Sequence, residues 1–389
     1  MDKVRFGIIG VGNMGYAHAK CFDGGGVENG VLTAVADIAP AKLERIKKEI
    51  KQPVALFDDA EKMLDSKLID AVIVAVPHYF HPPLVISALK KGIHAISEKP
   101  AGVYTKQVKE MNDAARKSDK LFAVMFNQRT NCVYRKMREL ILNGEIGDIK
   151  RINWMITNWY RTQSYYDSGE WRATWSGEGG GVLFNQCPHQ LDLLQWVTGM
   201  MPCKIRSFCH FGKWHNIEVE DDVTAYLEYE NGATGCFITS TADWPGTNRF
   251  EVLGTMGRLI CENDKLNFIK LKQNEREFNF TCEHGFAVPD SYEVEVVTDG
   301  KNTQHAGILN NFANAVLGIE PLFVDGTEGI NGVELMDAML LSAWKNQSVS
   351  LPIDDDEYLS YLKEKIAGSK KKAFKDVTFD ISGTYSGGK

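Results

Sequence analysis

The sequence lacks any run of about 20 apolar residues, the length that a helix needs to cross a bilayer. It also lacks an excess of basic residues: 44 lysines and arginines stand against 51 aspartates and glutamates, a net charge of −7. Because nucleic acids and anionic membranes bind basic surfaces, we expect neither as a partner. We expect no signal peptide, since Gly7, Gly10 and Gly12 interrupt the first apolar stretch.

Closely paired cysteines are missing as well. None of the eight cysteines forms a CxxC pair; they are Cys21, Cys132, Cys187, Cys203, Cys209, Cys236, Cys261 and Cys282. Disulfide frameworks and structural zinc sites use closely spaced cysteines. We therefore expect buried free thiols, no metal site and a reducing, cytoplasmic location.

The start of the chain carries the strongest motif that is present. An apolar stretch over residues 4–9 leads into Gly10-x-Gly12-x-x-Gly15 and then into a helical pattern, the order of a dinucleotide-binding turn. Gly10 makes the tight turn, Gly12 lets the backbone approach a pyrophosphate, and Gly15 lets the helix pack close to the strand. The pyrophosphate would lie at the helix N-terminus, where the dipole favours an anion.

Asp37 follows a second apolar strand, about 20 residues beyond the last glycine, where dinucleotide-binding domains place a ribose-binding carboxylate. A carboxylate binds ribose hydroxyls but repels a 2′-phosphate, and no arginine follows at positions 38–40. These residues favour NAD over NADP. The alternative is that Asp37 only caps the helix that begins at Pro40.

Strand and helix patterns alternate up to residue 127. Strands are expected near residues 4–9, 32–37, 54–57, 71–76, 94–97 and 121–126. The uninterrupted apolar run at 71–76 is typical of a strand buried on both faces of a parallel sheet. Asp58 and Thr105 are expected to cap the helices that follow them. Residues 1–127 are therefore predicted to form a doubly wound α/β domain, the Rossmann type.

From residue 128 the pattern changes. Residues 149–160 alternate between apolar and polar, and Asn231-Gly232 joins two further alternating runs as a hairpin turn. We predict that residues 128–353 form an α+β domain with a large open, mainly antiparallel sheet and helices on one face. Residues 354–389 are expected to form a helical appendage and a tail that could pack on a neighbouring subunit.

Two short stretches contain side chains suited to catalysis. Lys99 follows the strand at 94–97, at the sheet edge where ligands of open α/β sheets bind, and can hydrogen-bond a substrate hydroxyl. His189 and Asp192 follow a triple glycine and Asn185, and a helix would place them on one face. A histidine suits the removal of an alcohol proton. The alternatives are a surface Glu98–Lys99 ion pair and a core histidine.

Taken together, the glycine motif, residues 75–81 (Ala-Val-Pro-His-Tyr-Phe-His), Glu98-Lys99-Pro100 and the triple glycine with His-x-x-Asp resemble the Gfo/Idh/MocA family of oxidoreductases. This family is named for glucose-fructose oxidoreductase, inositol 2-dehydrogenase and a rhizopine-catabolism enzyme. The resemblance covers about residues 4–352. It implies an NAD(P)-binding Rossmann domain, a second domain that carries the substrate face, and oligomers formed through the second sheet.

The resemblance also implies roles for individual residues. Lys99 matches the catalytic lysine and His189 the general base. Many relatives have an aspartate four residues before that histidine, where this chain has Asn185, so Asp192 is the remaining candidate to orient His189. The predicted cofactor-binding residues are Gly10, Gly12, Asn13, Met14, Gly15, Asp37, Val76, Pro77, His81, Glu98, Lys99 and Asn127.

Aromatic and arginine residues precede the triple glycine and are candidates for contacts with a sugar. They are Tyr160, Arg161, Trp171, Arg172 and Trp175. Aromatic rings stack on the apolar faces of pyranoses, although a tryptophan in the core is the alternative. This density of rings favours a bulky polyol or glycoside over a small hydroxy acid.

The sequence thus predicts an NAD-dependent oxidoreductase that acts on a secondary hydroxyl of a sugar, glycoside or cyclitol, with the C3 carbon of a glucoside as one option. One alternative is a glycosidase- or epimerase-like enzyme that keeps NAD bound and has no net redox change. Another is a non-catalytic protein that senses NAD or a sugar. A homo-oligomer is expected in each case.

Overall fold

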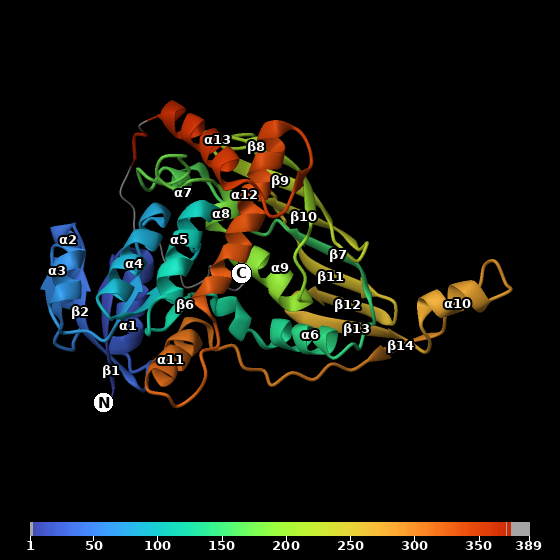
Figure 1. Ribbon diagram of the computed structural model, residues 1–389, viewed down its shortest axis with the longest axis horizontal. Helices are drawn as coiled ribbons and strands as arrows, with labels where there is room; N and C mark the ends of the chain where they lie inside the picture. The colour runs from blue at the N-terminus through green and yellow to red at the C-terminus, as the bar shows by residue number, and fades with distance from the viewer. Residues whose placement is uncertain (1–2, 371, 375–389) are drawn as a thin grey trace.

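The computed structural model describes residues 3–370 and 372–374, so most of the predicted tail lies outside the described residues. The chain forms two sheets with helices between them (Figure 1). Within the described part of the chain, no helix is long and apolar enough to cross a membrane.

The first sheet has six parallel strands in the order β3-β2-β1-β4-β5-β6. Its strands are β1 (Val4–Ile9), β2 (Gly30–Ala36), β3 (Ala55–Phe57), β4 (Ala71–Val74), β5 (His94–Ser97) and β6 (Phe122–Val124). The covering helices are α1 (Asn13–Asp23), α2 (Pro40–Glu49), α3 (Ala60–Asp65), α4 (His81–Lys90) and α5 (Thr105–Arg116). This strand order confirms the predicted Rossmann fold, whose ligands bind at the carboxyl ends of the strands.

The second sheet has nine strands in the order β14-β13-β12-β11-β7-β10-β9-β8-β15. They are β7 (Ile149–Ile156), β8 (Lys204–Phe211), β9 (Glu220–Glu228), β10 (Thr234–Ser240), β11 (Asn248–Gly254), β12 (Gly257–Glu262), β13 (Lys265–Leu271), β14 (Ser291–Val294) and β15 (Val349–Ser350). All neighbouring pairs are antiparallel except β7 and β10. The predicted large, mainly antiparallel sheet is confirmed.

The remaining helices lie mostly on the face of the second sheet that is turned toward the first domain (Figure 1). They are α6 (Cys132–Leu142), α7 (Gln163–Tyr166), α8 (Val182–Asn185), α9 (Pro188–Thr198), α10 (Glu275–Thr281), α11 (Gln304–Val316), α12 (Gly329–Lys345) and α13 (Asp355–Gly368). Three short 3-10 helices are η1 (His78–Phe80), η2 (Asn127–Thr130) and η3 (Gly326–Glu328).

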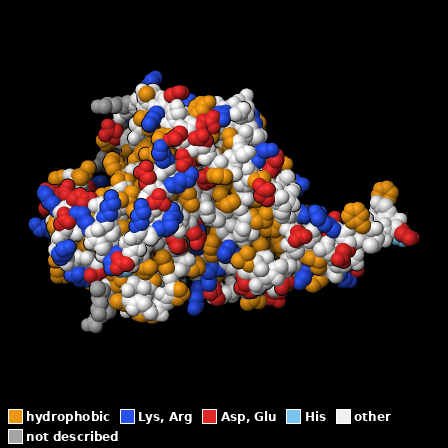
Figure 2. Space-filling view, in the orientation of Figure 1, with side chains coloured by type: hydrophobic (Ala, Val, Ile, Leu, Met, Phe, Trp, Pro, Cys, Tyr) orange, Lys and Arg blue, Asp and Glu red, His pale blue; other side chains and the backbone are white. Residues whose placement is uncertain are grey.

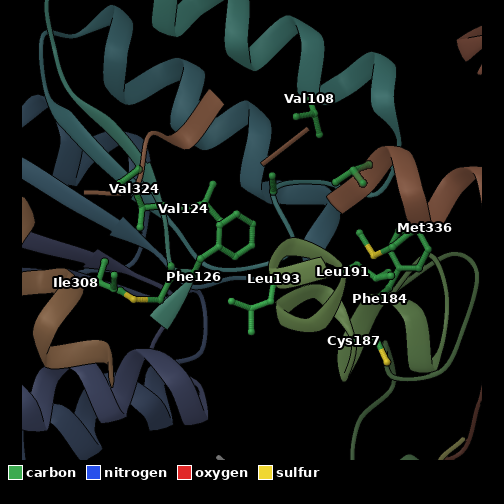
Figure 3. Packing of buried hydrophobic residues seen from close by; sticks show 14 of the residues in the cluster. Val108, Val124, Phe126, Phe184, Cys187, Leu191, Leu193, Ile308, Val324 and Met336 are labelled. Atoms are coloured by element: carbon green, nitrogen blue, oxygen red, sulfur yellow. The ribbon is translucent and has the colours of Figure 1, made fainter. Parts of the chain in front are cut away.

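The two domains share one apolar core. Close to the junction, Phe126 beyond β6 lies near Leu193 of α9, with Ile308 of α11 on its other side (Figure 3). Met336 of α12 belongs to the same cluster and lies beside Leu191 and Phe184. The sequence pattern assigns α11 to the second domain, yet the Phe312 ring of α11 lies 6.3 Å from that of Phe6 in β1. The junction is therefore a packed region rather than an open hinge.

Several local predictions are wrong. Helix α3 is capped by Asp59, whose side chain accepts the N–H of Lys62, because Asp58 lies one residue too early. Thr105 is the first residue of α5 and not its cap; its hydroxyl donates to Asp355 of α13. The strand predicted over residues 149–160 ends at Ile156.

Helix α13 packs on its own chain, and whether the appendage also contacts a neighbouring subunit stays a prediction. Tyr358 and Leu362 are buried, and the Tyr358 ring stacks on Trp344 of α12 with centroids 5.4 Å apart. Lys109 of α5 forms an ion pair with Asp355 at 2.6 Å. Helix α13 thus packs against α5 and α12.

Candidate active site

The glycine loop has the geometry that a dinucleotide requires. Gly10 has φ +85°, and a Cβ there would lie 2.5 Å from the backbone oxygen of Ala75. A Cβ on Gly15 would lie 1.9 Å from the oxygen of Gly10, so only glycine lets α1 pack against this turn. At Gly12 a Cβ would meet nothing within 4 Å, so its backbone is open to a ligand. Asn13, Met14 and Gly15 form the first turn of α1, where the helix dipole favours a phosphate.

Asp37 lies beside this loop at the end of β2. Its carboxylate accepts the N–H groups of Val11 at 2.8 Å and Ala39 at 2.9 Å. It thus contacts the glycine loop and the residue before α2, but it does not cap that helix: the N-cap is Ala39, and no side chain makes a capping hydrogen bond there. The open glycine loop, the helix N-terminus and this carboxylate fit NAD.

His81 contacts both the loop that follows β4 and the loop that follows β5. Its ring nitrogens lie 2.7 Å from the carbonyl oxygen of Val76 and 2.7 Å from that of Pro100. The side chain is buried and both nitrogens face backbone, so His81 holds these loops in place. Burial lowers the pKa of His81. A direct contact of Val76, Pro77 or His81 with the cofactor stays a prediction.

Glu98 lies at the end of β5, and its Oε1 is 2.6 Å from Nε2 of His18. The other carboxylate oxygen accepts the backbone N–H of Lys99 at 3.2 Å. Burial opposes ionisation of Glu98, but the hydrogen bond with His18 and the nearby imidazole of His305 outweigh it, and its pKa falls to about 2. Glu98 is therefore a carboxylate throughout the neutral pH range. The alternative of an exposed Glu98–Lys99 ion pair is wrong.

Lys99 points toward the second domain. Its Nζ donates a hydrogen bond of 2.7 Å to the backbone oxygen of Asn185, at the end of α8. Burial lowers the pKa of Lys99, because the ammonium loses hydration, while Glu98 and Glu178 raise it. The first domain therefore supplies a partly buried cation to the segment that leads into His189.

His189 lies in the first turn of α9, one helical turn beyond Asn185. Burial lowers its pKa well below the usual value, and the charge of Lys99 lowers it further. The imidazole is therefore neutral at pH 7 and can accept a proton. Its Nδ1 is buried and makes no hydrogen bond with the described residues, and its ring meets Phe126 edge-on at 6.5 Å.

Asp192 does not orient His189. Its two carboxylate oxygens accept hydrogen bonds from Arg129, at 2.8 and 2.6 Å, and both side chains are 1% exposed. Arg129 also donates to Glu328 at 2.6 Å. This buried pair joins η2 to α9, and it uses both carboxylate oxygens of Asp192.

A carboxylate that the sequence reasoning missed takes part instead. Glu178, just before the triple glycine, is 1% exposed and accepts a hydrogen bond from the side-chain amide of Asn185. Asn185 Oδ1 accepts the hydroxyl of Tyr165 at 2.9 Å, and that hydroxyl oxygen accepts Arg172 Nη1 at 2.7 Å. No periodicity marks Glu178; an acid beside three glycines is the only signal in the sequence.

Of the predicted sugar-contacting residues, Trp171 and Arg172 lie at this network. The Trp171 ring meets His78 of η1 at 5.8 Å, and the Arg172 guanidinium lies 4.4 Å from the Tyr165 ring centroid. His78, from the motif at residues 75–81, also lies here: its Nδ1 is 3.1 Å from the backbone oxygen of Glu178.

The other three predicted sugar-contacting residues, Tyr160, Arg161 and Trp175, lie in different environments. Tyr160 is 47% exposed, and Arg161 donates to its backbone oxygen at 2.9 Å. Trp175 is 4% exposed and packs against Phe211 at 5.7 Å and Trp344 at 5.6 Å, so the core interpretation is the correct one for this residue.

Asn127 is the first residue of η2, three residues after the end of β6. Its side-chain amide donates to Gln304 of α11 at 2.5 Å, and it is fully buried. In the described part of the chain, no group of three or more histidine, cysteine or acidic side chains could hold a metal ion.

The fold and this site together define an NAD-binding oxidoreductase of the Rossmann type. Residues 4–126 match the family described as "Oxidoreductase family, NAD-binding Rossmann fold", and residues 134–260 match the GFO/IDH/MocA C-terminal domain. The chain belongs to the Gfo/Idh/MocA family.

Curated relatives extend over much of the chain. Myo-inositol 2-dehydrogenase of Thermotoga maritima is 24% identical over 357 residues, covering 90% of this chain and 98% of its own. D-glucoside 3-dehydrogenase of Escherichia coli is 28% identical over 259 residues, covering 62% and 71% respectively.

Solved structures share the fold. The WlbA dehydrogenase from Chromobacterium violaceum, in complex with NADH and UDP-GlcNAcA, has a TM-score of 0.78 and 26% identity over 91% of this chain and 97% of its own. A levoglucosan dehydrogenase in complex with NADH and L-sorbose has a TM-score of 0.76 over 91% of this chain and 100% of its own. At 19% identity, the latter shows the fold alone.

Proposed function

We propose that this protein is an NAD-dependent dehydrogenase that oxidises a secondary hydroxyl of a sugar, glycoside or cyclitol. The observation that carries the proposal is the arrangement of Lys99 and His189. Lys99 comes from the first domain, and its ammonium binds the backbone oxygen of Asn185, one helical turn before His189. The charge of Lys99 acts on the neutral imidazole of His189, so a cation and a base lie in the same site.

Each residue has a chemical task in this proposal. His189 accepts the proton of the substrate hydroxyl, because its buried imidazole is neutral at pH 7. Lys99 donates a hydrogen bond to the same oxygen and stabilises the negative charge that develops there. NAD, held by the glycine loop and Asp37, supplies the hydride acceptor. Trp171 and Arg172 bind the substrate ring and its hydroxyls.

For the carbon that is oxidised, we favour C3 of a glucoside. The similarity to D-glucoside 3-dehydrogenase and the aromatic residues beside the site support this choice. A second candidate is a reaction without net redox change. Its support is the relative 2,7-anhydro-N-acetylneuraminate hydratase of Escherichia coli, 26% identical over 308 residues.

We also propose that copies of this chain associate through the second sheet. On the face away from the helices, three large apolar side chains are exposed: Met155 (41%), Tyr226 (41%) and Phe208 (54%). Helix α10 projects beyond the sheet without a buried residue, and hydrophobic side chains cover the end of this projection (Figures 1 and 2). Light scattering of the purified protein tests this, and a monomer at working concentration would contradict it.

The function is tested by following nicotinamide absorbance with added NAD and a panel of inositols, free sugars and glucosides. We expect NADH to form with one substrate class. His189→Ala should lower turnover by about 10²-fold or more while leaving NAD affinity nearly unchanged. His210→Ala is the matched control, because His210 is exposed on β8, outside the site.

The outcomes separate the candidates. Full turnover by His189→Ala would show that His189 is not the base. A protein that purifies with bound cofactor, and converts substrate without external NAD, would favour the reaction without net redox change. Binding of NAD with no conversion of any substrate class would favour a sensing protein.

A further inference from the structure

Glu178 is held on both of its carboxylate oxygens. Oε2 accepts the backbone N–H of Ala173 at 2.5 Å, and Oε1 accepts the side-chain amide of Asn185. A protonated carboxyl would use one oxygen as a donor, and among the described residues neither oxygen meets an acceptor. Two accepted N–H bonds therefore favour the ionised form, although burial raises the pKa of this group.

The Asn185 residue connects this carboxylate to Lys99. Its side chain is bound by Glu178, and its backbone oxygen accepts the Lys99 ammonium at 2.7 Å. The side-chain oxygen of Asn185 accepts a hydrogen bond from the Tyr165 hydroxyl, whose oxygen in turn accepts one from Arg172. Asn185 thus links Glu178 to two cations that come from different parts of the chain.

Lys99 forms no salt bridge within 4 Å in the part of the chain that is described. Glu98, the other carboxylate near it, is already hydrogen-bonded to His18. The side chain of Asn185 is neutral, and Glu178, seven positions earlier, accepts a hydrogen bond from its amide. Glu178 therefore supplies a negative charge next to the residue that binds Lys99.

We propose that Glu178 is a positioning residue of this site. Its carboxylate fixes Asn185, and so fixes the backbone oxygen that binds the Lys99 ammonium, while its charge offsets that of Lys99. The inference depends on the proposed role of Lys99 for its functional meaning. It assigns no direct contact between Glu178 and the substrate.

Several charged or titratable groups lie near Glu178. Lys99 and Arg172 are the cations of the network, and Lys372 beyond α13 adds a more distant positive charge. His78, whose Nδ1 contacts the Glu178 backbone, is kept neutral because burial lowers its pKa well below the usual value. Glu220 lies behind the triple glycine; burial raises its pKa to about 8, so it is uncharged near pH 7.

Glu178→Gln tests the charge, since it keeps the shape and one acceptor oxygen. The pKa of Lys99 is measured by competitive acetylation with acetic anhydride and mass spectrometry of the Lys99 peptide, which needs no substrate. Because an opposite charge at short range favours the ammonium, we expect the pKa of Lys99 to fall by about one pH unit. With an active substrate, the alkaline limb of kcat/KM should move to lower pH by the same amount.

Two further variants complete the experiment. Glu170→Gln, an exposed residue on the same loop, makes the same charge change and should leave Lys99 unaltered. Glu178→Asp keeps the charge but shortens the reach to Asn185, so it should lower kcat while moving the pKa of Lys99 much less than Glu178→Gln does. Glu178→Asp also provides a test if Glu178→Gln fails to fold.

An unchanged Lys99 pKa in folded Glu178→Gln would overturn the inference, as would a shift in Glu178→Asp equal to that expected for complete loss of the charge. The acetylation result does not depend on turnover. If the wild-type protein converts no substrate and Glu178→Gln still lowers the Lys99 pKa, the proposed function fails and the electrostatic role of Glu178 stands.

Discussion

Gly12→Ala separates cofactor binding from folding. A Cβ at Gly12 would meet no protein atom within 4 Å, and its φ of −64° lies outside the left-handed region that favours glycine. The protein should therefore fold with a stability loss below about 1 kcal/mol, the range of a glycine-to-alanine change at a helix N-cap. The added methyl would occupy the space through which the pyrophosphate approaches the backbone.

Steric overpacking typically costs about 1–3 kcal/mol, which corresponds to a roughly 5- to 150-fold higher dissociation constant for NAD. Binding is measured by isothermal titration calorimetry, and stability by thermal unfolding without cofactor. Gly285→Ala is the control, because its Cβ position is equally open but far from the loop. Gly15→Ala should behave oppositely and lower the unfolding temperature, since its Cβ would lie 1.9 Å from a backbone oxygen.

An NAD affinity of Gly12→Ala equal to that of the wild type would refute this reasoning, because the pyrophosphate could not then lie against Gly12. A large loss of stability in the same variant would refute the assignment of open space at that position.

Three other predictions follow from the structure. Asp37→Ala should weaken NAD binding with little change in the turnover measured at saturating NAD, which initial-rate kinetics can test. Arg129→Met leaves Asp192 buried without its cation and should cost about 3–5 kcal/mol in urea unfolding; a loss below 1 kcal/mol would contradict that. Burial raises the pKa of Glu220 from 4.5 to about 8, so the folded state retains a proton that the unfolded state releases. Its contribution to stability is complete below pH 4.5 and is lost as the pH rises to about 8, on the order of 5 kcal/mol. Glu220→Gln should remove this component of the pH dependence, and an unaltered pH profile of the unfolding free energy would count against it.

The local features of the site were predictable from the sequence. The glycine loop, Asp37, Lys99 and His189 follow from spacing along single strand–turn–helix segments, supported by the family resemblance for the last two. Their surroundings were not predictable. Trp175 is buried although its segment is polar and glycine-rich, because Phe211 and Trp344 come to it from distant elements.

Asp192 is a second residue whose surroundings were not predictable from the sequence. Its spacing from His189 is correct for one helical face, yet a buried arginine 63 residues earlier binds both of its oxygens. A bidentate, charge-assisted contact with a guanidinium is stronger than one hydrogen bond to an imidazole. Spacing along a helix shows which side chains are neighbours, but it does not show which partner from elsewhere reaches them.

By itself, the sequence determined the parallel first sheet, the dinucleotide turn and the position of the lysine and histidine, because these depend on steric and hydrogen-bonding rules that act over a few residues. Only the tertiary structure decided which acid supports them. Asn185 joins Glu178 to Lys99 through side-chain and backbone atoms of segments more than 75 residues apart. Such contacts are selected by packing and by the cost of burying an unpaired charge, and these arise only when the whole chain is folded.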